Sequence, residues 1–163
     1  MASRRDVLRY SAVGLGAIGL GVGPGSAKPG GRSQGAAGAT HFAPLTHGES
    51  QNPDLVPTGA TGFATFSLNE DGTLAYRITA RKVEDVVFAH IHGQAPRGET
   101  AGVVAFLFDF RPDLQDGPVD ESGTVMDTGL VSAIVANPEL YYVNLHTALN
   151  PAGEIRGQIR PRG

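Results

Sequence analysis

Three histidines stand at positions where strand geometry could bring their side chains to one metal ion. His90 and His92 lie two residues apart in VVFAHIHG (86–93), and His146 lies in YYVNLHT (141–147). Side chains two apart on a strand point the same way, about 6.5–7 Å apart along the chain. An all-imidazole set suits Zn or Cu, and three ligands leave one coordination position open. The pattern therefore indicates a single Cu or Zn site at these three residues.

A structural role explains the same histidines without a metal. Half-buried imidazoles at these positions would donate hydrogen bonds to backbone carbonyls and to Asn144 or Glu154. The sequence leaves both interpretations open. His41 and His47, near the first expected strand, are interpreted as surface residues.

Alternation along three expected strands places hydrogen-bonding side chains on one face. Along 86–92, Val87, Ala89 and Ile91 face one way, while Val86, Phe88 and the two histidines face the other. The segments 141–147 and 154–160 alternate in the same manner and are expected to be hairpin neighbours, so their polar side chains should form one patch. The members of this polar face are Tyr142, Asn144, His146, Glu154, Arg156 and Gln158.

Glu154 and Arg156 stand two apart on this expected face. We interpret them as an ion pair or a hydrogen-bonded strut between strands, the alternative being a substrate clamp. A general base at Glu154 would need burial or a like-charged neighbour to raise its pKa, and nothing in the sequence shows either. We therefore assign no catalytic residue.

The motifs of several catalytic classes are missing from the sequence. The chain has no cysteine, which excludes a disulfide framework, a thiolate metal site and a cysteine nucleophile. It has no G-x-S-x-G motif and no glycine loop that follows a strand and opens a helix to cradle phosphate. Whether the protein is an enzyme stays open, and a non-enzymatic role is favoured.

The N-terminal residues are typical of an export signal. Arg4 and Arg5 begin an S-R-R-x-x-L-R pattern of the twin-arginine type, and a short, glycine-diluted apolar run follows to about Val22. We predict a twin-arginine-type signal peptide over 1–27, a flexible Gly/Pro/Ser linker over 28–39 and a folded domain over 40–161. The expected location is therefore outside the cytoplasmic membrane: extracellular, periplasmic or at the cell surface. Retention of the segment as an uncleaved anchor is the alternative.

The charge of the mature chain argues against two kinds of partner. Removing residues 1–27 takes away Arg4, Arg5, Arg9 and Asp6 and leaves 10 basic and 15 acidic residues, a net charge of −5. No basic stripe with interleaved aromatic residues is present, so we expect no nucleic-acid partner. No basic amphipathic helix is present, so we expect no membrane binding after signal cleavage.

Period-two patterns dominate the expected domain and predict seven or so short strands. NEDG (69–72) between two alternating runs predicts a hairpin. GVVAFLFDF (102–110) reads as a strand covered on both sides, and RPDLQDGPVDESG (111–123) as an acidic loop. TGLVSAIVANPEL (128–140) predicts one helix that ends before Pro138. The fold class is therefore all-β: an antiparallel, Greek-key-like β-sandwich or flattened barrel with one short helix.

Three segments resemble one known family, the CHRD domain, which is named for chordin and found in secreted bacterial and archaeal proteins. They are ATGFATFSLNEDGTLAYRITA (60–80), AHIHGQAPRGETAGVVAFL (89–107) and YYVNLHTALNPAGEIRGQI (141–159). The resemblance covers about residues 40–161. It implies an extracellular β-sandwich that acts as a binding or structural module for an unidentified ligand or protein, without a settled reaction.

A looser resemblance concerns the architecture of Cu/Zn superoxide dismutases, which are Greek-key sandwiches with an H-x-H strand pair and a third copper-binding histidine on a later strand. His90, His92 and His146 are similar to that trio in order and strand setting. The chain lacks a metal-bridging histidine with a zinc loop, a cysteine pair and a second Asp/His cluster. The resemblance therefore implies at most a mononuclear copper or zinc protein, with dismutase-like redox activity as one outcome.

Overall fold

The strands follow one another in the sheet in an order different from their order along the chain. The computed structural model describes residues 38–109 and 118–163, so the predicted signal and residues 28–37 of the predicted linker lie outside the described residues. Nine strands are described, in the sheet order β5-β4-β7-β8-β1-β2-β3-β6 with β9 paired to β1. Their bounds are β1 His41–Thr46, β2 Thr61–Leu68, β3 Leu74–Arg81, β4 Val86–Gly93, β5 Val103–Phe108, β6 Val119–Val125, β7 Tyr141–Thr147, β8 Ile155–Gln158 and β9 Arg160–Pro161.

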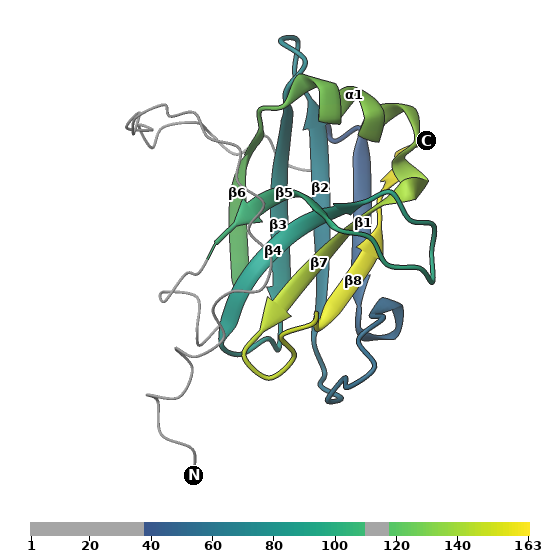
Figure 1. Ribbon diagram of the computed structural model, residues 1–163. Helices are drawn as coiled ribbons and strands as arrows, with labels where there is room; N and C mark the ends of the chain where they lie inside the picture. The colour runs from purple at the N-terminus through teal and green to yellow at the C-terminus, as the bar shows by residue number, and fades with distance from the viewer. Residues whose placement is uncertain (1–37, 110–117) are drawn as a thin grey trace, which may run out of the picture. The chain divides into compact units, whose positions relative to one another are not determined.

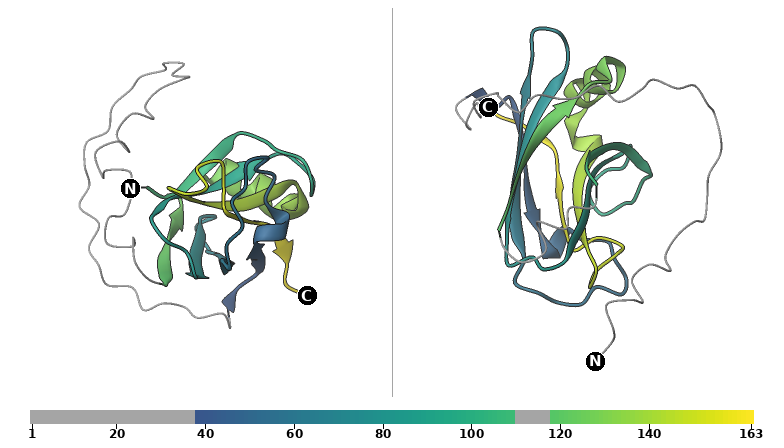
Figure 2. Two further views of the ribbon diagram at one scale, coloured as in Figure 1. Left: turned by 90° about the horizontal axis from the view of Figure 1, so that it is seen from below. Right: turned by 90° about the vertical axis from the view of Figure 1, so that its left-hand side faces the viewer.

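All described strand pairs are antiparallel, and the sheet folds back on itself into two layers (Figures 1 and 2). One layer holds β6, β3, β2 and β1, and the other holds β8, β7, β4 and β5. The pairing of β8 with β1 joins the layers along one edge, and β5 comes close to β6 along the other. The predicted sandwich or flattened barrel is therefore confirmed.

The core between the layers is built largely from alternate residues of the strands. On β2 and β3 these residues include Ala64, Phe66, Tyr76 and Ile78, all of which are buried. The predicted hairpin joins β2 to β3, with Gly72 at φ +80°, a conformation that glycine adopts without a steric penalty. The period-two pattern thus identifies the inward face of these strands correctly.

The predicted helix is α1, Thr128–Ala136, and it lies across one end of the two layers (Figure 1). Its N-terminus is capped by Asp127, whose side chain accepts a hydrogen bond from the Leu130 amide. Val131 and Ile134 project into the core. Two short 3₁₀ helices, η3 (His47–Glu49) and η5 (Pro138–Leu140), follow β1 and α1.

Two strand predictions were wrong in their details. Residues 119–123, which the sequence predicts as part of an acidic loop, belong to β6. Only the two end valines of this strand are strongly apolar, but it pairs with β3, and Gly123 leaves room for the Tyr76 side chain. The uniformly apolar segment 102–110 predicts a strand covered on both faces, but β5 exposes Val103, Val104 and Phe106. It ends the sheet order, where its side chains have fewer neighbours than those of an inner strand.

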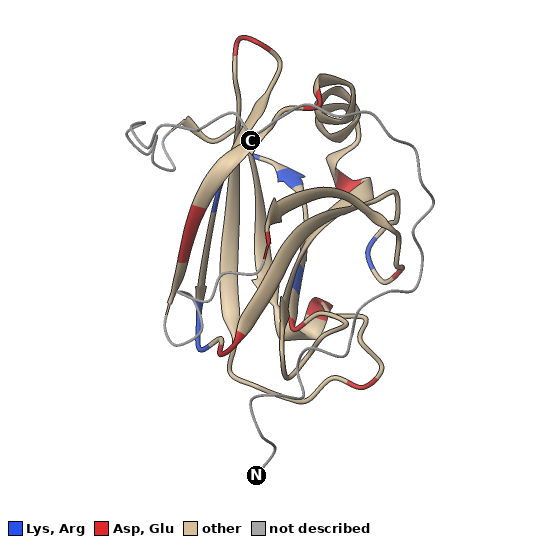
Figure 3. Ribbon diagram, turned by 60° about the vertical axis from the view of Figure 1, so that its left-hand side comes forward, with Lys and Arg blue, Asp and Glu red and all other residues tan. Residues whose placement is uncertain are grey.

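Charged residues are spread over the strands and loops of the described part (Figure 3). On the outer surface, Arg77 of β3 binds Asp120 of β6 through two hydrogen bonds of 2.7 and 2.6 Å. No helix within residues 38–109 and 118–163 is long and apolar enough to cross a membrane.

Candidate metal centre

Neighbouring strands β4 and β7 place the three predicted histidines on one face of the sheet. The two strands pair so that His90 lies opposite Asn144, His92 opposite Tyr142 and His146 opposite Phe88. One ring nitrogen from each histidine lies within 4.8 Å of the others. The three side chains are only 7–8% exposed. The sequence left open whether strand 86–92 lies beside 141–147; the two strands are neighbours, and the histidines meet.

Backbone carbonyls fix the ring orientation of two of these histidines. His92 Nδ1 lies 3.0 Å from the Ala101 carbonyl oxygen, and His146 Nδ1 lies 2.9 Å from that of Pro151. Because a carbonyl only accepts, each Nδ1 carries the proton and each Nε2 keeps its lone pair. Both Nε2 atoms and both nitrogens of His90 are buried without a hydrogen-bond partner among the described residues.

Burial keeps the trio neutral. It acts together with the nearby His146 and His92 to lower the pKa of His90 to about 4. Burial also lowers the pKa of His92 and of His146, against the opposing effect of their hydrogen bonds to backbone carbonyls. Neutral imidazoles are the form that binds metal, so the three rings are ready to act as ligands near pH 7.

Aromatic rings pack against the histidines and limit their contact with bulk solvent. Phe88 stacks on His90 at 5.5 Å between ring centroids, and Phe106 meets the same ring edge-on at 4.5 Å. Tyr142 stacks on His92 at 4.8 Å. Arg156 lies on β8, the second neighbour of β7, and its guanidinium is 3.5 Å from the centroid of the Tyr142 ring. Such apolar surroundings favour the uncharged form of each imidazole.

The loop between β4 and β5, residues 94–102, is tied to this polar face. His92 and the Tyr142 hydroxyl both donate to the Ala101 carbonyl, and the same hydroxyl accepts from the Ala101 amide. Arg156 donates to the Glu99 carbonyl at 2.7 Å. Gln158 donates to the carbonyl oxygens of Ala95 and Glu139. No sequence motif indicates this arrangement, because the loop contributes mainly backbone atoms.

Asn144 and Arg156 are adjacent members of the polar face, opposite each other in the β7–β8 register. The Asn144 side chain is 8% exposed and that of Arg156 is 2% exposed. Asn144 Oδ1 and Arg156 Nε are both buried without a hydrogen-bond partner among the described residues. One is an acceptor and the other a donor, so the face carries unused hydrogen-bonding capacity beside the histidines.

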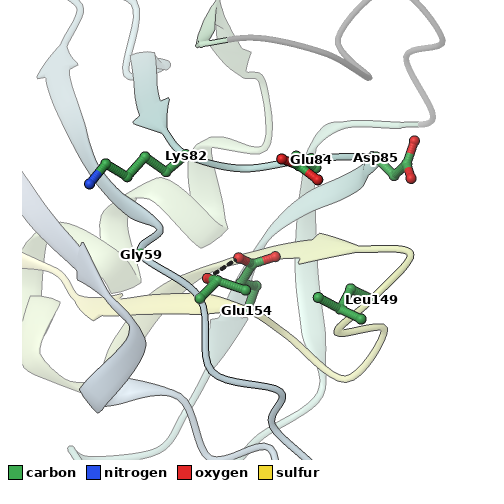
Figure 4. A pocket seen from close by; sticks show the side chains of 7 residues that line it. Gly59, Lys82, Glu84, Asp85, Leu149 and Glu154 are labelled. Atoms are coloured by element: carbon green, nitrogen blue, oxygen red, sulfur yellow. Dashed lines mark hydrogen bonds between the residues drawn. The ribbon is translucent and has the colours of Figure 1, made fainter.

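Glu154 does not join this face. Its carboxylate accepts hydrogen bonds from the hydroxyls of Thr58 at 2.5 Å and Thr147 at 2.6 Å. It lines a pocket with Gly59, Lys82, Glu84, Asp85 and Leu149 (Figure 4). No ion pair among the described residues links it to Arg156, so the expected strut between these two side chains is wrong. Glu154 precedes the first paired residue of β8, where strand alternation does not yet apply.

Two further placements depart from the expected pattern. Val86 belongs to the core, because a register shift between Val86 and Phe88 moves it to the inward face. His41 is 7% exposed, not a surface residue, since β1 is paired with β2 on one side and with β9 on the other, and its Nδ1 lies 3.0 Å from the Thr40 hydroxyl. His47 lies in η3, with its ring beside the backbone of Val56 and Thr58.

The residues that meet on this face can bind a cation through neutral nitrogen donors. The unpartnered ring nitrogens of His92 and His146 are acceptors, and neutral His90 adds a third. Three imidazoles without a carboxylate or thiolate suit Zn or Cu. The described residues on the face do not form a nucleophile–base pair of the hydrolase kind.

Comparison with known proteins gives one family and one relative. The family model described as CHRD domain matches residues 42–159. Chordin of Xenopus laevis is 32% identical over 117 residues, which make up 72% of this chain and 12% of chordin. The chain thus corresponds to a small part of that relative's length. No solved structure matches the chain significantly.

Proposed function

Because the chain belongs to the CHRD domain family, we propose that it is an exported binding module that holds one Cu or Zn ion at His90, His92 and His146. The family match lies inside the proposed domain, residues 40–161. Residues 1–27 would then direct export as a twin-arginine-type signal, and residues 28–39 would separate the signal from the domain. The ligand or protein bound by the module is not assigned.

One observation carries the metal site: three buried imidazoles present unpartnered nitrogens within 4.8 Å of one another. A buried polar atom without a partner is destabilising by about 1–3 kcal/mol, and here at least three such atoms face one another. A single ion would satisfy all three at once. The structural interpretation accounts for the Nδ1 hydrogen bonds to Ala101 and Pro151, but it leaves the Nε2 atoms of the same rings unexplained.

The hydrogen bonds of the ligand rings to backbone carbonyls also fit a metal. Histidine ligands generally donate their other ring N–H to a carbonyl or carboxylate, which fixes the ring and strengthens the ligand. His92 and His146 have this arrangement. Zinc at such a site would act as a structural ion or Lewis acid, whereas copper would add one-electron chemistry of the dismutase kind.

Elemental analysis of the purified exported protein tests the metal site. We expect about one Cu or Zn per chain. The double variant His90→Ala, His92→Ala should lose the metal while still melting cooperatively. His47→Ala, which removes a histidine outside the trio, should keep it and serves as the matched control. Wild-type protein that cannot be loaded with either metal would refute the site.

The export proposal has its own test. Changing Arg4→Lys and Arg5→Lys keeps the charge but removes the paired arginines of the signal. In a host with a twin-arginine pathway, we expect the wild-type protein outside the cytoplasm and the double variant inside it. Equal export of both proteins would refute a twin-arginine route.

A further inference from the structure

The side-chain oxygen of Asn144 is a buried acceptor without a partner among the described residues. Asn144 lies between Tyr142 and His146 on the same face of β7 and opposite His90 on β4. Directly opposed residues of antiparallel strands have Cβ atoms about 4.5–5.5 Å apart. The amide group of Asn144 is therefore a neighbour of two of the three proposed ligands.

The position of this amide is restricted by the turn between β7 and β8. The amide packs against Gly153, and a side chain at that position would overlap both of its terminal atoms. Gly153 has φ +116°, a conformation that other residues rarely adopt. The turn therefore provides a close-fitting backbone surface for Asn144.

Asn144 Oδ1 needs a hydrogen-bond donor, and the unpartnered atoms around the three histidines indicate which donor would fit. The ring nitrogens offered by the histidines are acceptors, and so is Asn144 Oδ1. A bare ion would satisfy one nitrogen of each ring and leave the oxygen unpaired, because amide oxygen is a poor ligand for Cu and Zn beside imidazole. A tetrahedral site with three protein ligands takes water as its fourth ligand, and that water has O–H groups to donate.

We propose that Asn144 is a positioning residue of the metal centre, whose Oδ1 accepts a hydrogen bond from the water molecule that completes the coordination of the ion. The inference rests on the proposed metal site. Asn144 would then determine which small molecules can replace that water. A ligand able to donate a hydrogen bond keeps the contact, whereas an anion without a proton faces the lone pairs of the amide oxygen.

Azide binding to the Cu(II)-loaded full chain tests the inference, because azide displaces water from copper and has no proton to donate. We expect the wild-type electron paramagnetic resonance spectrum to broaden in ¹⁷O-enriched water, which shows that water is bound. We expect Asn144→Leu to bind copper with the same stoichiometry and to bind azide about three- to tenfold more tightly, since its water has lost one hydrogen bond. Asn144→Ala serves in its place should the leucine variant not fold.

Asn69→Leu is the matched control. It removes the same amide group from the exposed β2–β3 hairpin, where the side chain donates to the Thr73 hydroxyl, so azide affinity should stay at the wild-type value. Equal azide affinity in the Asn144 variants and the wild type would overturn the inference and point to a water held between Asn144 and Arg156 alone. Absence of ¹⁷O broadening in the wild type would also overturn it, as expected for direct ligation by Asn144. Failure of the wild type to bind copper would instead refute the metal site itself.

Discussion

The rings of His92 and Tyr142 lie face to face, with centroids 4.8 Å apart and planes within 6° of parallel. The two residues are direct partners in the β4–β7 register, and both donate a hydrogen bond to the Ala101 carbonyl. The tyrosine thus limits the orientation of a proposed ligand through its ring and holds the loop 94–102 through its hydroxyl.

These two roles of Tyr142 can be separated by substitution. Tyr142→Phe keeps the ring and loses the hydroxyl, so we expect it to lower the free energy of unfolding by about 1 kcal/mol and to leave metal affinity nearly unchanged. Tyr142→Leu loses the ring as well, and we expect metal affinity to fall about tenfold, a typical effect of disturbing the support of a ligand. Competition with a chromophoric chelator measures both affinities, and wild-type affinity in the leucine variant would contradict the ring's role.

The stability of the metal-free protein should depend on pH through the buried histidines. The pKa of His90 is about 4 in the folded chain, against an ordinary value of 6.5. As pH falls below 6.5 the unfolded chain gains a proton that the folded chain does not accept until about pH 4. The free energy of unfolding should therefore be greatest above pH 6.5 and decrease between about pH 6.5 and 4.

Chemical denaturation of chelator-treated protein across this pH range measures the effect. His90→Leu should show a shallower decrease, because one of the histidines with a lowered pKa is gone. His92, His146 and His41, whose pKa values burial also lowers, keep part of the slope in the variant. An identical slope in variant and wild type would show that His90 takes up its proton equally in both states.

Glu154→Gln should affect stability and not metal binding. Both carboxylate oxygens accept hydrogen bonds from threonine hydroxyls. In the glutamine variant an NH2 group replaces one of these oxygens, and this group cannot accept the hydrogen bond of the hydroxyl that it faces. We expect the free energy of unfolding to fall by about 1–3 kcal/mol, measured by urea denaturation. Metal content should remain at the wild-type level; a loss of metal would mean that Glu154 supports the histidine cluster after all.

Gly157→Ala should be strongly destabilising because β8 meets β1 at this position. A Cβ at residue 157 would overlap the Pro44 carbonyl and approach the Leu45 side chain. Backbone atoms cannot rotate away as side chains can, so we expect a cost of about 3 kcal/mol, at the upper end of overpacking effects. Gly48→Ala, where nothing lies within 4 Å of the added atom, is the control and should unfold like the wild type in urea.

Strand alternation made much of this site predictable. Tyr142, Asn144 and His146 alternate with Tyr141, Val143 and Leu145 along β7, and the structure places the second set in the core and the first on the opposite face. A spacing of two residues was therefore enough to align His90 with His92. To meet His146, these two histidines also need β4 to lie beside β7, and the sheet order shows that the two strands are neighbours.

Alternation fails where the backbone departs from a regular strand. Val86 changes face at a register shift, and Glu154 lies in the turn before β8. Strict two-residue alternation therefore assigns both side chains to the wrong face of the sheet. The strand β6 was missed because sheet pairing, with Arg77 bound to Asp120, holds a segment that has little apolar character of its own. These features depend on contacts between distant segments, which a local pattern does not contain.

The loop 94–102 is held through its backbone at Ala95, Glu99 and Ala101. The side chains from Pro96 to Thr100 are exposed, and of these Arg97 binds Glu49 of η3. Apart from Arg97, their identities can therefore drift during evolution while the loop keeps its path. Related domains could in this way present different outer surfaces to different neighbours above an unchanged set of histidines.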